Sequence, residues 1–347
     1  MATILAKVIR GSTVESVHRG HLIVIDGRRN TLFSMGDPRT VTFFRSAAKP
    51  FQAMPCLTSG AADAFGFSDE EIALACASHS GEVRHVRIAS LMLERIGLTE
   101  AHLHCGSHFP FNEKETERMQ RAGEFPTQLH NNCSGKHAAM LATAKHIGAD
   151  IADYESAGNQ LQDEILNAVA LFAEVPKESI RTGIDGCAAP NFAISVEAMA
   201  RSFINLILPP PHFEETARKA AERIVSGMRN FPDLIGGTDR LDTMLMQAAE
   251  GKIISKVGAD GVWLCGVLPS EQWPDGLAIA LKIEDGNDYR ARPVVAVEVL
   301  RKLGVLAADS LPDVSPMPIK NRRGDIVGRV KPGRINIKTD QPASRLM

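Results

Sequence analysis

Short runs of apolar residues, of the kind that form β-strands, are concentrated at the two ends of the chain. They are rich in β-branched and aromatic residues and are bounded by turn residues, such as the Asp26-Gly27 pair that predicts a hairpin. A short edge strand is also compatible with the pattern of residues 325–330. The other predicted strands cover residues 17–25, 30–35, 40–44, 252–257, 261–267 and 276–284.

The middle of the chain follows the 3.6-residue period of amphipathic helices instead. Residues 161–172 and 217–228 each place their apolar side chains on one helix face. Ser68, followed three residues later by Glu71, predicts a capped helix start. A last long helix is predicted for residues 293–303.

This order of elements predicts an α+β fold, in which N- and C-terminal strands meet in one antiparallel sheet flanked by helices. Residues 1–45 and 250–347 would supply the sheet, and residues 46–249 would form a largely helical lobe against it. Three N-terminal strands alone bury little apolar surface, whereas the joined sheet with its covering helices buries enough for one core. We therefore expect a single domain over residues 1–347, with a pocket at the seam between the two lobes.

Composition and charge narrow the class of protein. The chain has 39 Lys and Arg against 41 Asp and Glu, a net charge of −2, and only 5% aromatic residues, so we expect neither a nucleic-acid nor a membrane partner. Six cysteines in 347 residues are too few for a disulfide framework. Without a recognisable signal peptide or an apolar run near the roughly 18 residues of a membrane span, the expected location is the cytoplasm.

The sharpest chemical signal is a Ser-x-x-Lys pattern at a predicted strand-to-helix junction, Ser46 and Lys49. Residues three apart lie on the same face of a helix, so the amine is expected to reach the hydroxyl. Serine becomes a good nucleophile only when a base takes its proton, and lysine is such a base only when its pKa is lowered. The alternative is that Ser46 caps the helix and Lys49 is solvated.

Two further segments carry residues that suit the same chemistry. Ser78 lies in a Ser-rich stretch between two predicted helices, where a hydroxyl faces a cleft or simply caps the next helix. Lys256 lies on a predicted strand two residues before Gly258, which is typical of the pocket strand of serine acyltransferases. The alternative for Lys256 is a surface lysine on an edge strand.

Two Gly-containing polar turns each hold one cysteine, Cys133 and Cys187. Buried, reduced cysteines are the default interpretation, but the two turns are also able to meet in the cleft. Asp185, directly before a glycine, is suited to receive a substrate ammonium group. The segment His102–His108 is dense in metal-binding side chains but lacks the spacing of a known metal motif.

Taken together, six motifs occur in an order that resembles the L-asparaginase II, or rhizobial-type, family. The resemblance implies a fold similar to serine β-lactamases, penicillin-binding proteins and glutaminases, in agreement with the predicted layout. It extends over nearly the whole chain, so the set is far more specific than any single motif. The motifs are residues 45–50 (RSAAKP), 76–80 (CASHS), 132–137 (NCSGKH), 182–187 (TGIDGC), 256–261 (KVGADG) and 282–287 (KIEDGN).

The resemblance implies roles for individual residues. Two Ser–Lys tandems would form the catalytic site, with Arg45 lining the substrate pocket and Asp185 binding the substrate ammonium group. A Zn²⁺ ion would lie beside the pocket, although lysine is an unusual zinc ligand that must lose its proton to bind. The family also suggests a homodimer. The tandems match Ser46 with Lys49 and Ser78 with Lys256, and the zinc ligands match Cys133, Lys136 and Cys187.

The expected reaction is hydrolysis of L-asparagine to L-aspartate and ammonia, with Ser46 as nucleophile, Lys49 as base and Ser78 as proton relay. Three alternatives stay open. A glutaminase differs by one methylene of substrate, worth only ~1–3 kcal/mol of discrimination. A β-lactamase or D,D-peptidase shares the fold but usually carries an export signal. A non-catalytic, zinc-containing amino-acid-binding protein would not need both Ser–Lys tandems.

Overall fold

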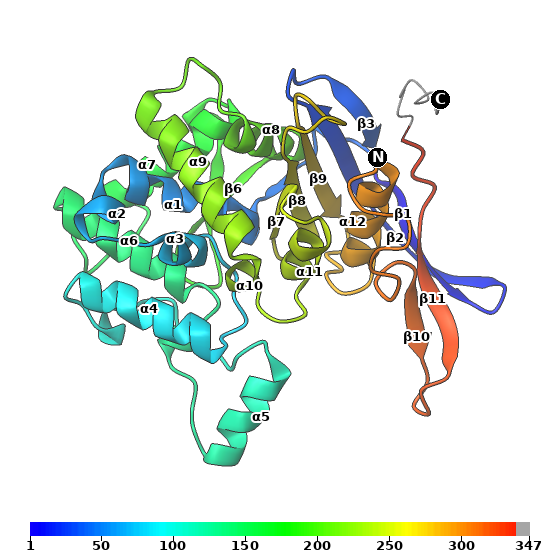
Figure 1. Ribbon diagram of the computed structural model, residues 1–347, viewed down its shortest axis with the longest axis horizontal. Coiled ribbons are helices and arrows are strands. Elements are labelled where there is room, and N and C mark those ends of the chain that lie inside the picture. Colours follow the sequence, from blue (N-terminus) through cyan, green and yellow to red (C-terminus); the bar gives the residue numbers. More distant parts are fainter. Residues whose placement is uncertain (338–347) are drawn as a thin grey trace.

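The computed structural model describes residues 1–337 and combines a large antiparallel sheet with a lobe of helices (Figure 1). The predicted α+β class, with strands from both ends of the chain in one sheet, is confirmed. Within these residues the spatial order of the sheet is β10 (Met317–Lys320), β11 (Ile326–Pro332), β1 (Thr3–Arg10), β2 (Thr13–Asp26), β9 (Leu277–Ile283), β8 (Val262–Val267) and β7 (Ile253–Val257), with β3 (Thr31–Met35) also paired to β2.

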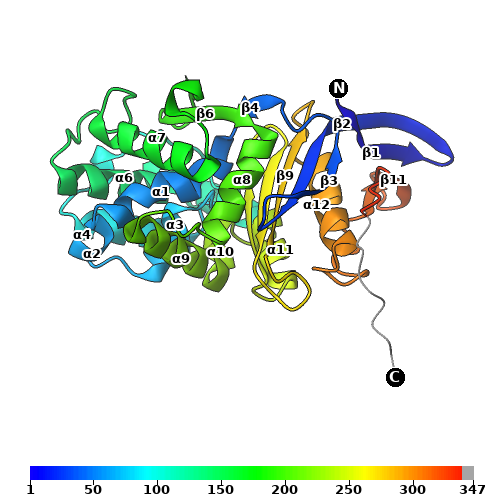
Figure 2. The ribbon, with the colours of Figure 1, turned by 90° about the horizontal axis from the view of Figure 1, so that it is seen from above.

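The central strands are apolar along their whole length because both faces of the sheet are covered. Every residue of β8 is buried, and so is every residue of β9 except Lys282. Helix α8 (Val196–Ile207) packs against β2, β8 and β9, whereas α12 (Ala291–Lys302) covers the opposite face (Figure 2). A strand buried on both sides does not need the alternating pattern of a half-exposed strand.

A second, three-stranded sheet corrects the prediction for residues 40–44. Strand β4 (Val41–Phe43) lies outside the large sheet and pairs with β6 (Pro190–Ser195), which also pairs with β5 (Arg181–Ile184). Strands β5 and β6 escaped prediction because they are short and lie between long helices. This small sheet brings the chain before Ser46 next to the turn that carries Asp185.

The ends of the large sheet also differ from the prediction. The segment predicted as an edge strand forms β11, but it lies between β10 and β1, so β10 is the edge. Strand β1 was not predicted, although it pairs with both β2 and β11. An edge strand and an inner strand differ in their partners rather than in their own residues, so the sequence pattern does not separate them.

Most of the helices gather on one side of the sheet around α6 (Ser134–Ile147), which is buried on nearly every side (Figure 1). Within residues 1–337 four 3₁₀ helices, η1 (Arg45–Ala48), η2 (Glu100–His102), η3 (Gln128–His130) and η4 (Lys177–Ser179), connect the longer elements. The division into one domain with two lobes stays a prediction. The remaining helices are α1 (Lys49–Thr58), α2 (Ala61–Ala64), α3 (Asp69–Ala75), α4 (Val83–Arg95), α5 (Glu113–Ala122), α7 (Gln160–Ala173), α9 (Glu215–Asn230), α10 (Pro232–Ile235) and α11 (Leu241–Ala248).

Three of the predicted helices agree with the structure in detail. Ser68 caps α3, and the capping box with Glu71 is present. The apolar faces of residues 161–172 and 217–228 belong to α7 and α9. Within residues 1–337 no helix has both the length and the apolar character needed to cross a bilayer.

Candidate active site

Two lysine amines meet at one serine hydroxyl at the junction of the helices and the sheet. Lys49 is the first residue of α1, Ser78 follows α3, and Lys256 lies on β7. Ser78 Oγ accepts hydrogen bonds from Lys49 Nζ at 3.0 Å and from Lys256 Nζ at 2.9 Å. At most 5% of each residue is exposed, so the solvated alternatives for both lysines are wrong.

Backbone contacts hold Lys49 and Ser78 in this arrangement. The Ser78 amide donates to the carbonyl of Ile235 in α10 at 2.9 Å, which fixes the loop after α3. The Lys49 amine also donates to the carbonyls of Ala77, at 2.5 Å, and Asn132, at 3.1 Å. The position of the amine is therefore set by two separate segments of the chain, the loop after α3 and the turn before α6.

A buried carboxylate that sequence analysis missed supports Lys256. Asp242, in the first turn of α11, lies with Oδ2 3.5 Å from Lys256 Nζ. It also accepts hydrogen bonds from the Ser255 hydroxyl at 2.7 Å and from the Val257 amide at 3.0 Å. An acidic residue in the first turn of a helix ordinarily interacts favourably with the helix dipole, so nothing in the sequence marks Asp242 as part of the site.

The charge state of Lys256 follows from its surroundings. Burial lowers its pKa, Asp242 raises it, and the neighbouring Lys49 lowers it further. The net result is a pKa of about 8, so about a tenth of this amine is neutral at pH 7 and most of it is neutral above pH 8. A neutral lysine is able to accept a proton from a hydroxyl.

Ser46 is half-buried and lies three residues before Lys49 in the chain. Within the described residues no hydrogen bond joins Ser46 Oγ to Lys49 Nζ, so the predicted same-face contact is not formed. Ser46 belongs to the 3₁₀ helix η1, and the Lys49 amine turns towards Ser78 instead. Arg45, directly before Ser46, has a φ of 53°, a left-handed conformation that is costly for a residue other than glycine. Asn191 on β6 supports this turn by accepting the Arg45 amide at 3.0 Å.

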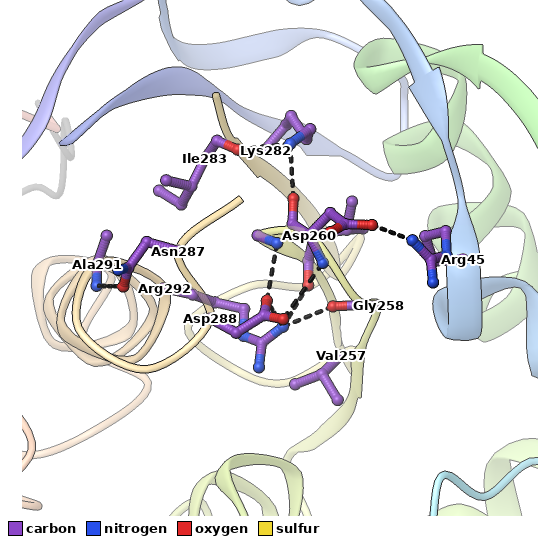
Figure 3. A network of polar contacts seen from close by, with 12 residues as sticks. Arg45, Val257, Gly258, Asp260, Lys282, Ile283, Asn287, Asp288, Ala291 and Arg292 are labelled. Carbon is purple, nitrogen blue, oxygen red and sulfur yellow. Dashed lines mark hydrogen bonds and ion pairs between the residues drawn. The ribbon is translucent and has the colours of Figure 1, made fainter. Parts of the chain in front are cut away.

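The guanidinium of Arg45 joins two carboxylates. Its Nε and Nη2 donate to Asp185 Oδ1, both at 3.1 Å. Its Nη1 forms an ion pair with Asp260, which lies in the turn between β7 and β8 (Figure 3). The structure therefore brings Arg45 and Asp185 together, as expected for two residues that bind one substrate, and adds Asp260 to them.

The three predicted zinc ligands also lie together. Cys133 precedes α6, Lys136 lies in the first turn of α6, and Cys187 lies in the turn after β5. Lys136 Nζ contacts Cys187 Sγ at 3.0 Å, and all three residues are buried. Two thiols and an amine form a donor set that suits Zn²⁺, whose preferred ligands include thiolates.

The protonation of these groups favours one thiolate. A hydrogen bond from Cys133, together with Lys136 and the adjacent His137, holds the pKa of Cys187 far below its usual value. The pKa of Cys133 is raised by Cys187 and by burial. Burial opposes the charge of Lys136, but the Cys187 and Cys133 sulfurs raise its pKa. A bound metal would have to displace the protons of Lys136 and Cys133.

The histidine-rich segment does not form a metal site in the described residues. His102 contacts Thr99, His104 pairs with Glu155 at 2.9 Å, and His108 accepts the Asn132 amide. No group of three or more His, Cys, Asp or Glu side chains in residues 1–337 is placed to hold a metal ion. The predicted zinc ligands Cys133, Lys136 and Cys187 fall outside this definition, because one of the three is a lysine.

The model of the L-asparaginase II family matches residues 6–332. The chain belongs to the L-asparaginase II family. Family membership supports an amidohydrolase as the class of enzyme, acting on an amide such as asparagine or glutamine. The family that the order of the six motifs predicted is therefore confirmed. Among curated proteins, none matches the chain.

Solved structures of similar fold are also found. A probable glutaminase from Bacillus subtilis, complexed with 6-diazo-5-oxo-L-norleucine, shares 13% identity at a TM-score of 0.43, covering 83% of this chain and 85% of its own. Mglu, in its tris and glutamate form, shares 16% identity at a TM-score of 0.44, covering 84% of this chain and 60% of its own.

Proposed function

We propose that this amidohydrolase converts L-asparagine into L-aspartate and ammonia, with Ser46, Lys49, Ser78 and Lys256 as its catalytic residues. The observation that carries the proposal is the buried Ser78 hydroxyl between two lysine amines, at 3.0 and 2.9 Å. Such an arrangement is costly for folding because it desolvates two amines. Proton transfer at the serine hydroxyl is a chemical function that would explain why two amines are buried beside it.

The substrate would bind through its amino-acid end at Arg45 and Asp185. An α-carboxylate is complementary to the guanidinium, and an α-ammonium group is complementary to the Asp185 carboxylate. Both side chains are partly exposed, 27% and 17%, whereas Ser78 is 5% exposed. Because Ser46 directly follows Arg45, it is the hydroxyl nearest in the chain to the bound amino acid.

In the proposed reaction Ser46 Oγ attacks the side-chain carbonyl of asparagine and gives its proton to Lys49, while Lys49 passes one of its own protons through Ser78 to neutral Lys256. The tetrahedral oxyanion would be stabilised by backbone amides at the start of η1. Ser78, which contacts both amines, would pass protons between Lys49 and Lys256. The leaving nitrogen takes up a proton and departs as ammonia, and water then releases aspartate from the Ser46 ester.

The test is coupled ammonia detection with L-asparagine and L-glutamine, on the wild type and on Ser46→Ala and Ser78→Ala. We expect the wild type to prefer asparagine and each variant to lose at least about 10³-fold in kcat/KM. Circular dichroism controls for folding. A wild type that releases ammonia from neither amide would contradict the proposal, and preference for glutamine would reassign the substrate.

The covalent step can be tested separately. We expect mass spectrometry of the enzyme treated with an asparagine analogue that acylates serine to find the adduct on the peptide that contains Ser46. An adduct on Ser78 alone would exchange the roles of the two serines.

We also propose that Cys133, Lys136 and Cys187 hold a Zn²⁺ ion that orders the pocket wall. Asp185 is two residues from Cys187, and the Asn132 carbonyl that accepts the Lys49 amine is next to Cys133. A metal held by both segments would therefore fix a substrate-binding residue and a partner of the base. The attacking group is still a serine, so the ion would not need to activate water.

Metal analysis of the purified chain tests this site. We expect about one zinc per chain in the wild type, loss of the metal in Cys187→Ser, and retention in Cys56→Ser, which changes a buried cysteine of α1. Removing zinc is expected to raise KM more than it lowers kcat. Equal metal content in Cys187→Ser and the wild type would contradict the assignment. The homodimer, which the family resemblance suggests, and the cytoplasmic location, which the sequence pattern suggests, stay predictions.

A further inference from the structure

Asp260 occupies the face of Arg45 that a substrate carboxylate would need. Asp185 takes the Nε and Nη2 donors of the guanidinium, and Asp260 pairs with Nη1. A carboxylate binds a guanidinium best through two parallel hydrogen bonds, which requires a free pair of donors. An α-carboxylate arriving at Arg45 would therefore compete with one of these two aspartates.

Of the two aspartates, Asp260 is the one that is free to leave. The Asp185 side chain is 17% exposed and also accepts the Gly186 amide at 2.8 Å. The Asp260 side chain is 65% exposed, and Arg45 is its carboxylate's only hydrogen-bond partner within residues 1–337. Water replaces that partner at low cost because an exposed ion pair contributes little.

The main chain around Asp260 is held firmly, so the movement would be confined to its side chain. Asp288 accepts the amides of Asp260, at 3.2 Å, and Gly261, at 2.7 Å (Figure 3). Lys282 Nζ donates to the Asp260 carbonyl at 2.6 Å, and Arg292 donates to the Gly258 carbonyl at 2.5 Å. The turn also keeps Asp260 in a left-handed conformation, with a φ of 57°.

The charges favour displacement of Asp260 by the substrate α-carboxylate over binding of both carboxylates to Arg45. Arg45 with Asp185 and Asp260 carries a net charge of −1, since one cation faces two anions. Adding the α-carboxylate of an amino acid would place three anions on one guanidinium, and like charges in close contact repel one another. The α-ammonium group stays matched by Asp185.

We propose that Asp260 is a specificity-determining residue that stands in for the substrate's α-carboxylate on Arg45 and swings into solvent when the substrate binds. This inference rests on the proposed hydrolysis of an amino-acid amide at this site. Competition from Asp260 raises the KM of carboxylate-bearing substrates. It does not act on the reacting atoms, so kcat is spared.

The experiment compares steady-state kinetics of the wild type and Asp260→Asn with L-asparagine and with L-asparagine methyl ester, whose α-carboxylate is masked. We expect the variant's KM for asparagine to fall roughly threefold to tenfold, with kcat within about twofold. KM for the methyl ester should not change. Glu284→Gln is the matched control, because Glu284 is an exposed carboxylate without a side-chain hydrogen bond in the described chain.

Four results would overturn the assignment. An unchanged KM for asparagine in Asp260→Asn would show that Asp260 does not compete, and a raised KM would show that it binds the ammonium group instead. An equal fall in KM for the ester, or in Glu284→Gln, would indicate a general effect of charge. Failure of the proposed function is distinguishable, because then the wild type itself releases no ammonia.

Discussion

At the scale of single residues, the arrangement around Ser78 depends on one lysine being neutral. Two ammonium groups on one buried hydroxyl would repel each other and leave no base. Lys256 resolves this conflict, because burial and the proximity of Lys49 lower its pKa to about 8 in spite of Asp242. The amine that accepts protons most readily is thus the one on the sheet.

This pKa predicts the pH dependence of the reaction. Below about pH 8 Lys256 is protonated and cannot accept a proton, so kcat/KM should rise with pH and level off above that value. The check is a pH–rate profile of the wild type between pH 5.5 and 9.5, values chosen to span the roughly two units on either side of the pKa. A flat profile through this range would contradict a role for Lys256 as base.

The variant Asp242→Asn tests whether Lys256, rather than another titrating group, causes the rise of the pH–rate profile. The carboxylate raises the pKa of Lys256, so its removal should lower that pKa and move the rising limb to lower pH. Asparagine keeps an acceptor for the Val257 amide, which limits structural change. If the limb stays in place, the titrating group is not Lys256.

At the scale of elements, two helices position the site through a very close contact. Helix α3 leads into the loop with Ser78, and α6 begins with the predicted zinc ligands. They touch at Gly135, where an added Cβ would lie 2.5 Å from the Leu74 carbonyl oxygen. Only glycine lets the two helices approach so closely.

Gly135→Ala should therefore push α6 away from α3. We expect the free energy of unfolding to fall by about 1–3 kcal/mol, the usual cost of overpacking, and kcat to fall because Ser78 moves. Urea denaturation and the ammonia assay measure both effects. Gly158→Ala is the control, since nothing lies within 4 Å of an added Cβ there, and it should be close to neutral.

At the scale of the whole molecule, the C-terminal strands complete the sheet begun by the N-terminal strands. Strand β11 pairs with β1 along five residues, and its Val330 is fully buried opposite Val8. The pairing joins residues from opposite ends of the chain, so the tail belongs to the core of the sheet.

Val330→Asp tests that conclusion. It would bury an unpaired carboxylate, and we expect the free energy of unfolding to fall by about 3–5 kcal/mol. Ile326→Asp on the same strand should cost less than about 1 kcal/mol, because Ile326 is 53% exposed. Similar urea midpoints for the two variants would contradict an integral role of the tail.

Local patterns in the sequence were enough to predict the fold class, helices α7 and α9, the start of α3, and the set of chemical groups. These follow from local patterns: the helical period of residues 161–172, the capping box at Ser68, and the order of short motifs. Helix formation depends largely on residues three and four positions apart, so helices can be predicted from the local sequence.

Which of those groups touch one another depends on how the whole chain folds. Lys49 was expected to reach Ser46 but contacts Ser78, and neither Asp242 nor Asp260 stood out in the sequence. Strand β4 belongs to the small sheet rather than the large one, and β11 is an inner strand rather than the predicted edge strand. The physical reason is that pairing, burial and pKa depend on partners supplied by remote segments, and no local pattern records which partner arrives.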